Sequence, residues 1–117
     1  MSRRRKVVFA VAAAVVLLDI AIATALSYYD SHTRKTLLAL AAQELPTRAS
    51  IADMEQFMRL HTARFALDDK YHHEYAGIVP QTRLDRLLFD RKVQVVLKLK
   101  EDRTFQSAEV RVYYTAL

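Results

Sequence analysis

Apolar residues dominate one long stretch near the N-terminus of this 117-residue chain, from Val7 to Tyr29. The stretch contains a single charged residue, Asp19, and neither proline nor glycine. At a rise of ~1.5 Å per residue, a helix of this length extends about 35 Å, enough to cross a hydrocarbon core of ~30 Å. The pattern therefore predicts a transmembrane helix over residues 7–29.

Two amphipathic helical segments follow. Residues 30–43 either continue the membrane helix outward or form a new helix capped by Ser31. After a turn at residues 45–49, Ser50 and Asp53 have the spacing of a capping box, which predicts a second helix that ends near His61. The first segment carries an apolar stripe at helical spacing, made of Leu37, Leu38, Ala41, Ala42 and Leu45.

The remaining pattern is typical of antiparallel strands. Residues 63–68 and 71–79 flank the turn sequence Asp68-Asp69-Lys70 and predict a hairpin. Residues 92–100 alternate most regularly, and residues 104–115 lose their alternation at Phe105, which predicts a bulge near Gln106 and Ser107. The intervening segment fits either a helical turn, a strand or a loop. The residues that would share its helical turn are Leu84, Leu87 and Leu88.

This order of elements indicates an α+β fold. An N-terminal transmembrane helix would be followed by a two-layer domain, in which two helices cover one face of a three- to four-stranded antiparallel sheet. We expect three regions: a basic end at residues 1–6, the membrane helix at 7–29, and one domain at 30–117.

Charge sets the expected orientation of the chain. The formal net charge is +5, and Arg3, Arg4, Arg5 and Lys6 supply four of the positive charges. Basic residues beside a membrane helix stay in the cytoplasm, so the domain is expected on the periplasmic or extracellular side of the cytoplasmic membrane. Residues 30–117 carry only +2, which together with this compartment argues against binding of nucleic acid.

A cleaved signal peptide is the alternative interpretation of the N-terminus. Ala23-Thr24-Ala25 has the small-x-small pattern of a signal peptidase site, and cleavage after Ala25 would release a periplasmic or secreted binding module. The length of the apolar run and the lack of a helix breaker before the site favour an uncleaved anchor.

Asp19 is the candidate contact within the membrane. A carboxylate near the bilayer centre costs roughly 2.5–3.5 kcal/mol on insertion scales, so such residues usually face a partner helix or become protonated. Either Asp19 binds a polar group of another membrane protein, or the strongly apolar helix tolerates it.

Composition excludes several classes of site. The chain has no cysteine and only one glycine, Gly77. Disulfides, cysteine-ligated metals and glycine-rich phosphate loops are therefore excluded, and no motif of a known catalytic class is present. We expect no enzyme activity and no cofactor, and nothing in the residues points to a small-molecule substrate.

The histidines offer a weaker hypothesis. His72, His73 and Glu74 are adjacent, with His61 nearby, and such side chains bind metals or respond to pH. Neighbouring residues on a strand point to opposite faces, so His72 and His73 would not share one metal, although His72 and Glu74 would share a face. Solvated histidines are the simpler interpretation.

Basic residues on the last two strands form a candidate partner surface. They are Lys92, Lys98, Lys100 and Arg111. They fit either a patch that contacts an anionic lipid or protein, or the solvated face of a strand that lysines protect from aggregation. We expect the partners to be the membrane and another envelope or membrane protein.

Residues 44–115 resemble, in pattern, the small bacterial envelope domains of the BamE-like group. The resemblance rests on the turn and capped helix of ELPTRASIADMEQFMRLH, followed by hairpin strands. It implies an envelope location and a role near membrane-protein assembly. The chain lacks the lipidated cysteine and the turn glycine usual in that group, so the resemblance assigns no functional residue.

Overall fold

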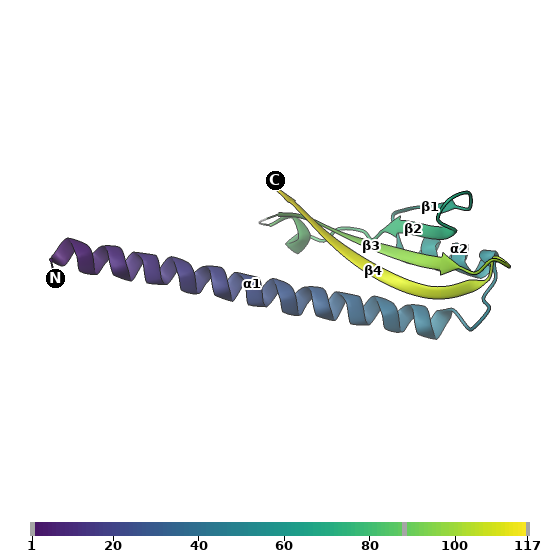
Figure 1. Ribbon diagram of the computed structural model, residues 1–117, viewed down its shortest axis with the longest axis horizontal. Coiled ribbons are helices and arrows are strands. Elements are labelled where there is room, and N and C mark those ends of the chain that lie inside the picture. Colours follow the sequence, from purple (N-terminus) through teal and green to yellow (C-terminus); the bar gives the residue numbers. More distant parts are fainter. Residues whose placement is uncertain (1, 88, 117) are drawn as a thin grey trace. The chain divides into compact units, whose positions relative to one another are not determined.

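The computed structural model describes residues 2–87 and 89–116 of the chain (Figure 1). The contacts divide the chain into two units, Met1–Thr33 and Arg34–Leu117. The predicted α+β fold is confirmed, with four strands in the described residues. The elements are α1 (Arg3–Glu44), α2 (Ile51–His61), β1 (Arg64–Asp68), β2 (Glu74–Ile78), the 3₁₀ turn η1 (Leu84–Arg86), β3 (Phe89–Leu99) and β4 (Phe105–Ala116).

The first unit is helical from Arg3 onwards, and it is long and apolar enough to cross a membrane. Every residue from 3 to 21 is exposed, including the large apolar side chains. The hydroxyl of Thr24 donates to the carbonyl oxygen of Ile20 at 2.8 Å, which satisfies that polar group within the helix. Helix α1 runs without a break past Ser31, so the alternative of a new helix at that residue is wrong.

The second unit has two layers. Its sheet is antiparallel throughout, in the order β1-β2-β3-β4. Alternate residues of the strands face the end of α1 and helix α2, and Val95 of β3 lies between Gly77 of β2 and Val110 of β4. The alternation predicted for β3 is confirmed. The buried core contains Leu37, Ala41, Leu45, Ala49, Met54, Phe57, Met58, Tyr75, Val93, Val95, Leu97, Leu99 and Val110.

One position of the predicted stripe on α1 is wrong. Leu37, Ala41 and Leu45 are buried, and Leu38 is partly buried against them. Ala42 is exposed. The buried residues follow one another at four-residue intervals, and Ala42 lies one residue, or about 100° of helical rotation, beyond that line.

The turn between α1 and α2 is fixed at both ends. The backbone N–H of Ala49 donates to Pro46 at 3.0 Å, and Arg48 adopts a φ of 67° within this turn. The predicted capping box is present: Ser50 Oγ accepts from the N–H of Asp53, and the Asp53 carboxylate accepts from the N–H of Ser50. The carbonyl of Ala49 also accepts from the N–H of Phe105, which ties the turn to the start of β4.

The first hairpin differs from its prediction. Strand β2 begins at Glu74, so Tyr71, His72 and His73 belong to the turn and not to the strand. The Asp68 carboxylate accepts from the N–H of Tyr71 at 3.1 Å and pairs with His72, and this side-chain-stabilised turn replaces further strand pairing.

The second hairpin agrees with its prediction. Lys98 pairs with Ser107, and Leu99 pairs with Phe105. Gln106 is therefore the extra residue of a β-bulge, as the loss of alternation predicted.

Candidate functional site

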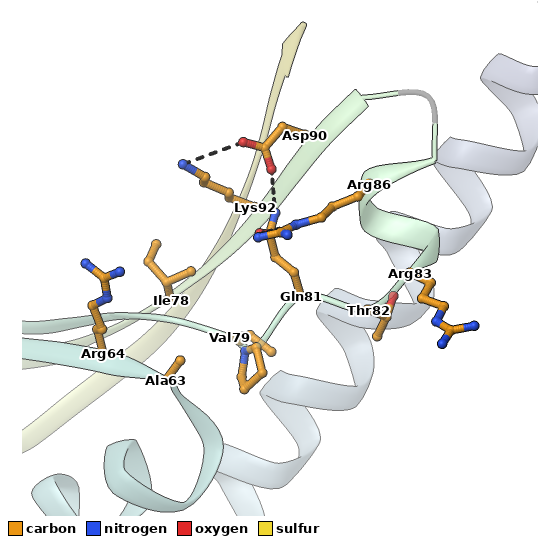
Figure 2. Close-up of a pocket in the computed structure, with 11 residues that line it drawn as sticks. Ala63, Arg64, Ile78, Val79, Gln81, Thr82, Arg83, Arg86, Asp90 and Lys92 are labelled. Carbon is orange, nitrogen blue, oxygen red and sulfur yellow. Dashed lines mark hydrogen bonds and ion pairs between the residues drawn. The ribbon is translucent and has the colours of Figure 1, made fainter. Parts of the chain in front are cut away.

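A groove with a volume of about 650 Å³ lies in the second unit, where β2 has ended and β3 continues (Figure 2). Cationic side chains come to it from β1, β3 and the segment around η1. Its apolar wall is formed by residues at the ends of β1 and β2. The lining residues are Ala63, Arg64, Ile78, Val79, Pro80, Gln81, Thr82, Arg83, Arg86, Asp90 and Lys92.

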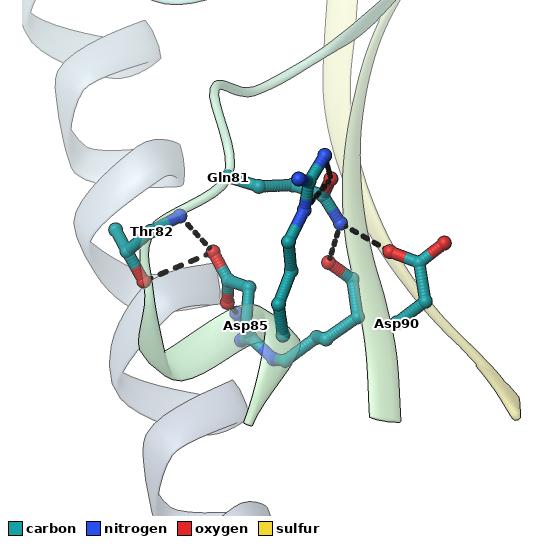
Figure 3. A network of polar contacts seen from close by, with 6 residues as sticks. Gln81, Thr82, Asp85 and Asp90 are labelled. Carbon is teal, nitrogen blue, oxygen red and sulfur yellow. Dashed lines mark hydrogen bonds and ion pairs between the residues drawn. The ribbon is translucent and has the colours of Figure 1, made fainter. Parts of the chain in front are cut away.

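Gln81 builds the floor of the groove (Figure 3). After Val79, whose N–H still bonds to Val93, the chain leaves the sheet at Pro80. The side-chain amide of Gln81 then donates to the carbonyl oxygen of Arg91 at 2.7 Å and to Asp90 Oδ1 at 2.6 Å. A side chain thus satisfies an edge acceptor of β3 that a neighbouring strand would otherwise satisfy.

A buried ion pair fixes η1 beneath the groove. Asp85 Oδ1 lies 2.7 Å from Arg91 Nη1, and the two side chains are 6% and 4% exposed. The other carboxylate oxygen of Asp85 accepts from the N–H of Thr82 at 2.7 Å and from its hydroxyl at 3.2 Å. These contacts offset the desolvation of the charges and position η1 against β3.

The described lining of the groove holds more cations than carboxylates, because Arg64, Arg83, Arg86 and Lys92 face a single Asp90. Among the described residues, Arg64 and Arg83 have no ion-pair partner, and Arg86 contacts only the neutral Oε1 of Gln81, at 3.0 and 3.2 Å. Figure 2 shows Arg86 reaching back to Gln81, while Arg83 extends away from it. The one carboxylate of the lining, Asp90, lies 3.8 Å from Lys92 Nζ.

The protonation of Asp90 follows from its contacts. The hydrogen bond from Gln81 lowers the pKa of this carboxyl group below 3.8, and Lys92 acts in the same direction. Asp90 is therefore ionised at neutral pH and has no proton to donate as a general acid. The arrangement as a whole can bind an anionic group, because three arginines offer planar, charged donors.

No protein-family model, curated protein or solved structure matches this chain. The resemblance of residues 44–115 to BamE-like domains therefore stays a similarity of pattern. Function must be inferred from the residues of the groove, the sheet and the apolar helix.

Three of the four predicted basic residues, Lys92, Lys98 and Arg111, lie on the same open face of the sheet. Lys92 also lines the groove, and Lys98 and Arg111 lie 3.5 and 3.3 Å from the same carboxylate oxygen of Glu109. Lys100 is exposed at the turn between β3 and β4. The hydrogen bond from Arg111 lowers the pKa of Glu109, so this pair stays ionised at neutral pH.

The histidines are also separated. His61 Nε2 lies 2.7 Å from Glu44 Oε2, which joins the ends of α2 and α1. His72 pairs with Asp68 at 2.6 Å, and His73 lies 3.7 Å from Asp69. Because His72 lies in the turn, the expectation that it shares a strand face with Glu74 is wrong. Within the described residues, no three His, Asp or Glu side chains are grouped so that they would hold a metal ion.

Asp19 lies on the apolar part of α1, where its side chain is exposed. Residues four before and after it on the helix, Val15 and Ala23, are exposed as well. This part of the helix therefore presents one carboxylate within an apolar surface that nothing in its own unit covers.

Sequence reasoning missed the residues that build the groove. Gln81, Asp85 and Arg91 carry no motif, and the sequence left a helical turn, a strand or a loop open for the segment of Leu84 and Leu87. The structure has a 3₁₀ turn there, in which Asp85 is buried while Leu84 and Leu87 are 66% and 68% exposed. Leu88, the third leucine of that prediction, lies outside the described residues. The alternation of β3 places Arg91 in phase with the buried Val93 and Val95, and this phase was the available signal.

Proposed function

We propose that the chain is a non-enzymatic accessory protein, anchored once in the cytoplasmic membrane, that binds another membrane or envelope protein. The observation that carries this proposal is the N-terminal part of α1, an uninterrupted helix whose apolar side chains are exposed from Val7 to Ile20. An apolar helix that nothing in its own unit covers is stable in a bilayer and costly in water.

The orientation follows from the charges before the helix. Arg3, Arg4, Arg5 and Lys6 hold the N-terminus in the cytoplasm, so the unit from Arg34 onwards lies on the periplasmic or extracellular side. Of the two candidate contacts with a partner, one lies within the membrane and the other outside it. Asp19 is available within the membrane, and the open sheet face with its turn presents Lys98, Lys100 and Arg111 outside it.

A binding role is favoured over catalysis by the groove itself. No histidine lines it, and Asp90 and Gln81 bond to each other. Among the described residues of its lining, the one hydroxyl is that of Thr82, which donates to a carboxylate that already pairs with Arg91. These groups hold the fold and lack the arrangement of nucleophile and base that activates a hydroxyl.

The proposal is tested by purifying the full chain from membranes in a mild detergent and recording the intact mass of the chain and its partners. We expect the full-length mass and a reproducible membrane-protein partner. A chain that begins at Leu26 would overturn the anchor and support the released binding module. A full-length chain that co-purifies with no partner would be consistent with the membrane anchor but would refute the accessory role.

Two substitutions in α1 separate a specific contact from a general effect on the helix. Asp19→Leu removes the exposed carboxylate, and we expect it to reduce the amount of co-purified partner. Thr24→Val is the matched control, because the hydroxyl of Thr24 is already bonded to Ile20 of the same helix. Equal recovery of the partner with both variants would exclude Asp19 as a contact.

A further inference from the structure

The segment around η1 has three distinct sides. In a 3₁₀ turn, side chains three residues apart lie on the same side. Arg83 and Leu87, which flank η1, also have helical backbone angles. Arg83 and Arg86 therefore share one side, Leu84 and Leu87 share another, and Asp85 on the third side is buried against Arg91.

The leucines form an apolar projection beside the cationic groove. Leu84 is 66% exposed and Leu87 is 68% exposed, and Phe89, two residues further on, is 41% exposed. Single exposed apolar residues are common and need no explanation. Here three occur within six residues, and they adjoin two arginines that lack a carboxylate partner among the described residues.

Apolar side chains next to arginines are the combination that binds the surface of an anionic membrane. The apolar groups enter the boundary between headgroups and acyl chains, and guanidinium groups bind phosphates in bidentate geometry.

The contacts within the second unit show at which end of the sheet the chain enters. Arg34, the first residue of the second unit, donates to the carbonyl of Val110, whereas Ala49 bonds to Phe105 at the start of β4. The chain thus enters this unit beside Val110, and β4 continues from there to pair with Asp90 and Phe89. The end of the sheet that carries η1 is therefore the end at which the chain enters.

The tether is short. Four residues, 30–33, separate Tyr29, the last residue of the expected membrane segment, from Arg34. The five helical steps from Tyr29 to Arg34 extend about 8 Å, which is comparable to the screening length of ~8–10 Å at physiological salt. A tether of this length would keep the domain at high effective concentration near the headgroup layer.

We propose that Leu84, Leu87 and Phe89, together with Arg83, Arg86, Arg64 and Lys92, dock the domain on the anionic phospholipids of the bilayer that anchors the chain. This inference rests on the proposed membrane anchor. Docking would fix the orientation of the domain. Arg64 and Lys92 lie on the same face of the sheet as Lys98 and Arg111, so the docked end would be continuous with the surface proposed for a protein partner.

The test uses a single cysteine in the full chain, which has no cysteine of its own. Leu87→Cys carries an environment-sensitive fluorophore, and the labelled chain is reconstituted into vesicles of phosphatidylcholine alone or mixed with phosphatidylglycerol. We expect a blue-shifted emission and quenching by spin-labelled acyl chains only with phosphatidylglycerol, and loss of both at high salt. A label at Tyr71→Cys, in the turn between β1 and β2, should show neither effect.

Charge variants identify the groups responsible. Arg83→Gln with Arg86→Gln should abolish the shift at position 87. Lys70→Gln with Lys100→Gln removes the same charge at the other two turns and should leave the shift unchanged. Leu84→Ser, an exposed substitution that spares the buried Asp85, should weaken the quenching and so tests the apolar part separately.

The outcomes distinguish this inference from the anchor. Extraction of the chain from the vesicles by alkaline washing would refute the anchor and the docking together. If the chain resists extraction but the fluorophore at position 87 keeps the emission of a water-exposed group in both kinds of vesicle, the docking is refuted and the anchor is not. If the emission at position 87 shifts only after polyglutamate is added, the surface binds an acidic protein, and the proposal of a phospholipid ligand is refuted.

Discussion

Gly77 of β2 lies in close contact with Met58 of α2. A Cβ at this position would lie 2.7 Å from Met58 Cε and 2.9 Å from the carbonyl oxygen of Arg64. The methionine can move, but the carbonyl belongs to the pairing of β1 with β2 and cannot move independently. The single glycine of the chain is therefore explained by packing and not by a turn.

We predict that Gly77→Ala destabilises the second unit by about 1–3 kcal/mol, the usual cost of overpacking a core. Urea unfolding of the full chain in detergent, followed by tyrosine circular dichroism, measures the change. Ala76→Ser is the control, because Ala76 lies on the opposite face of the same strand. If Gly77→Ala leaves the urea concentration at the unfolding midpoint unchanged, α2 can move away from the sheet without a loss of stability, and the prediction is contradicted.

The pair of Asp68 and His72 makes the first hairpin sensitive to pH. Its hydrogen bond raises the pKa of His72 above 6.5 and lowers the pKa of Asp68 below 3.8. The stabilisation from His72 is fully present below pH 6.5 and is lost as the pH rises through its raised pKa. The stabilisation from Asp68 is fully present above pH 3.8 and is lost as the pH falls through its lowered pKa.

We predict that Asp68→Asn lowers the pKa of His72 towards 6.5, as measured by NMR titration of its ring protons. Glu74 also raises this pKa and Arg111 lowers it, and both remain in the variant. Asp69→Asn is the control, because Asp69 contacts His73 instead. An identical titration in both variants would show that Asp68 does not hold His72.

At the scale of elements, the position of η1 depends on the buried pair of Asp85 and Arg91. We predict that Asp85→Ala destabilises the second unit by roughly 3–5 kcal/mol, because it leaves a charge in the interior without its carboxylate. Asp85→Ala combined with Arg91→Met should recover much of this loss. Urea unfolding of the native chain, the two single variants Asp85→Ala and Arg91→Met, and the double variant measures the coupling of the pair. A loss in the double variant equal to the sum of the two single losses would contradict this prediction.

The elements themselves were largely predictable because their causes are local. The capping box of Ser50 and Asp53, the alternation of β3 and the bulge at Gln106 each follow from residues close in sequence. The start of β2 was not predictable in this way. Asp68 accepts from the N–H of Tyr71 and pairs with His72, and these two interactions outweigh the β-propensity of Tyr71.

The candidate site was much less predictable than the fold. Lys92 was recognised as a basic residue of its strand, but the groove also requires Gln81 to reach the carbonyl of Arg91. That contact exists only because β2 ends before β3 does. The burial of Asp85 depends likewise on a guanidinium from another element, and no local pattern encodes such a pairing.

At the scale of the whole molecule, the proposed orientation rests on the charges around the apolar segment. Four basic residues precede this segment, whereas Asp30 follows it directly. Moving the basic end across a bilayer would be costly, so we propose that it stays in the cytoplasm and that the sheet lies outside.

We predict that Tyr71→Cys, exposed at the first hairpin, reacts with a membrane-impermeant maleimide added to intact cells that express the full chain. Ser2→Cys should react only after the membrane is permeabilised, and the native chain should never react because it has no cysteine. Replacing Arg3, Arg4, Arg5 and Lys6 by glutamine should invert part of the population, since these four charges supply most of the orientation signal. In that part, Ser2→Cys would react in intact cells, and Tyr71→Cys would react only after permeabilisation. Labelling of Ser2→Cys in intact cells would place the domain in the cytoplasm, and the open sheet face would then have to meet its partner there.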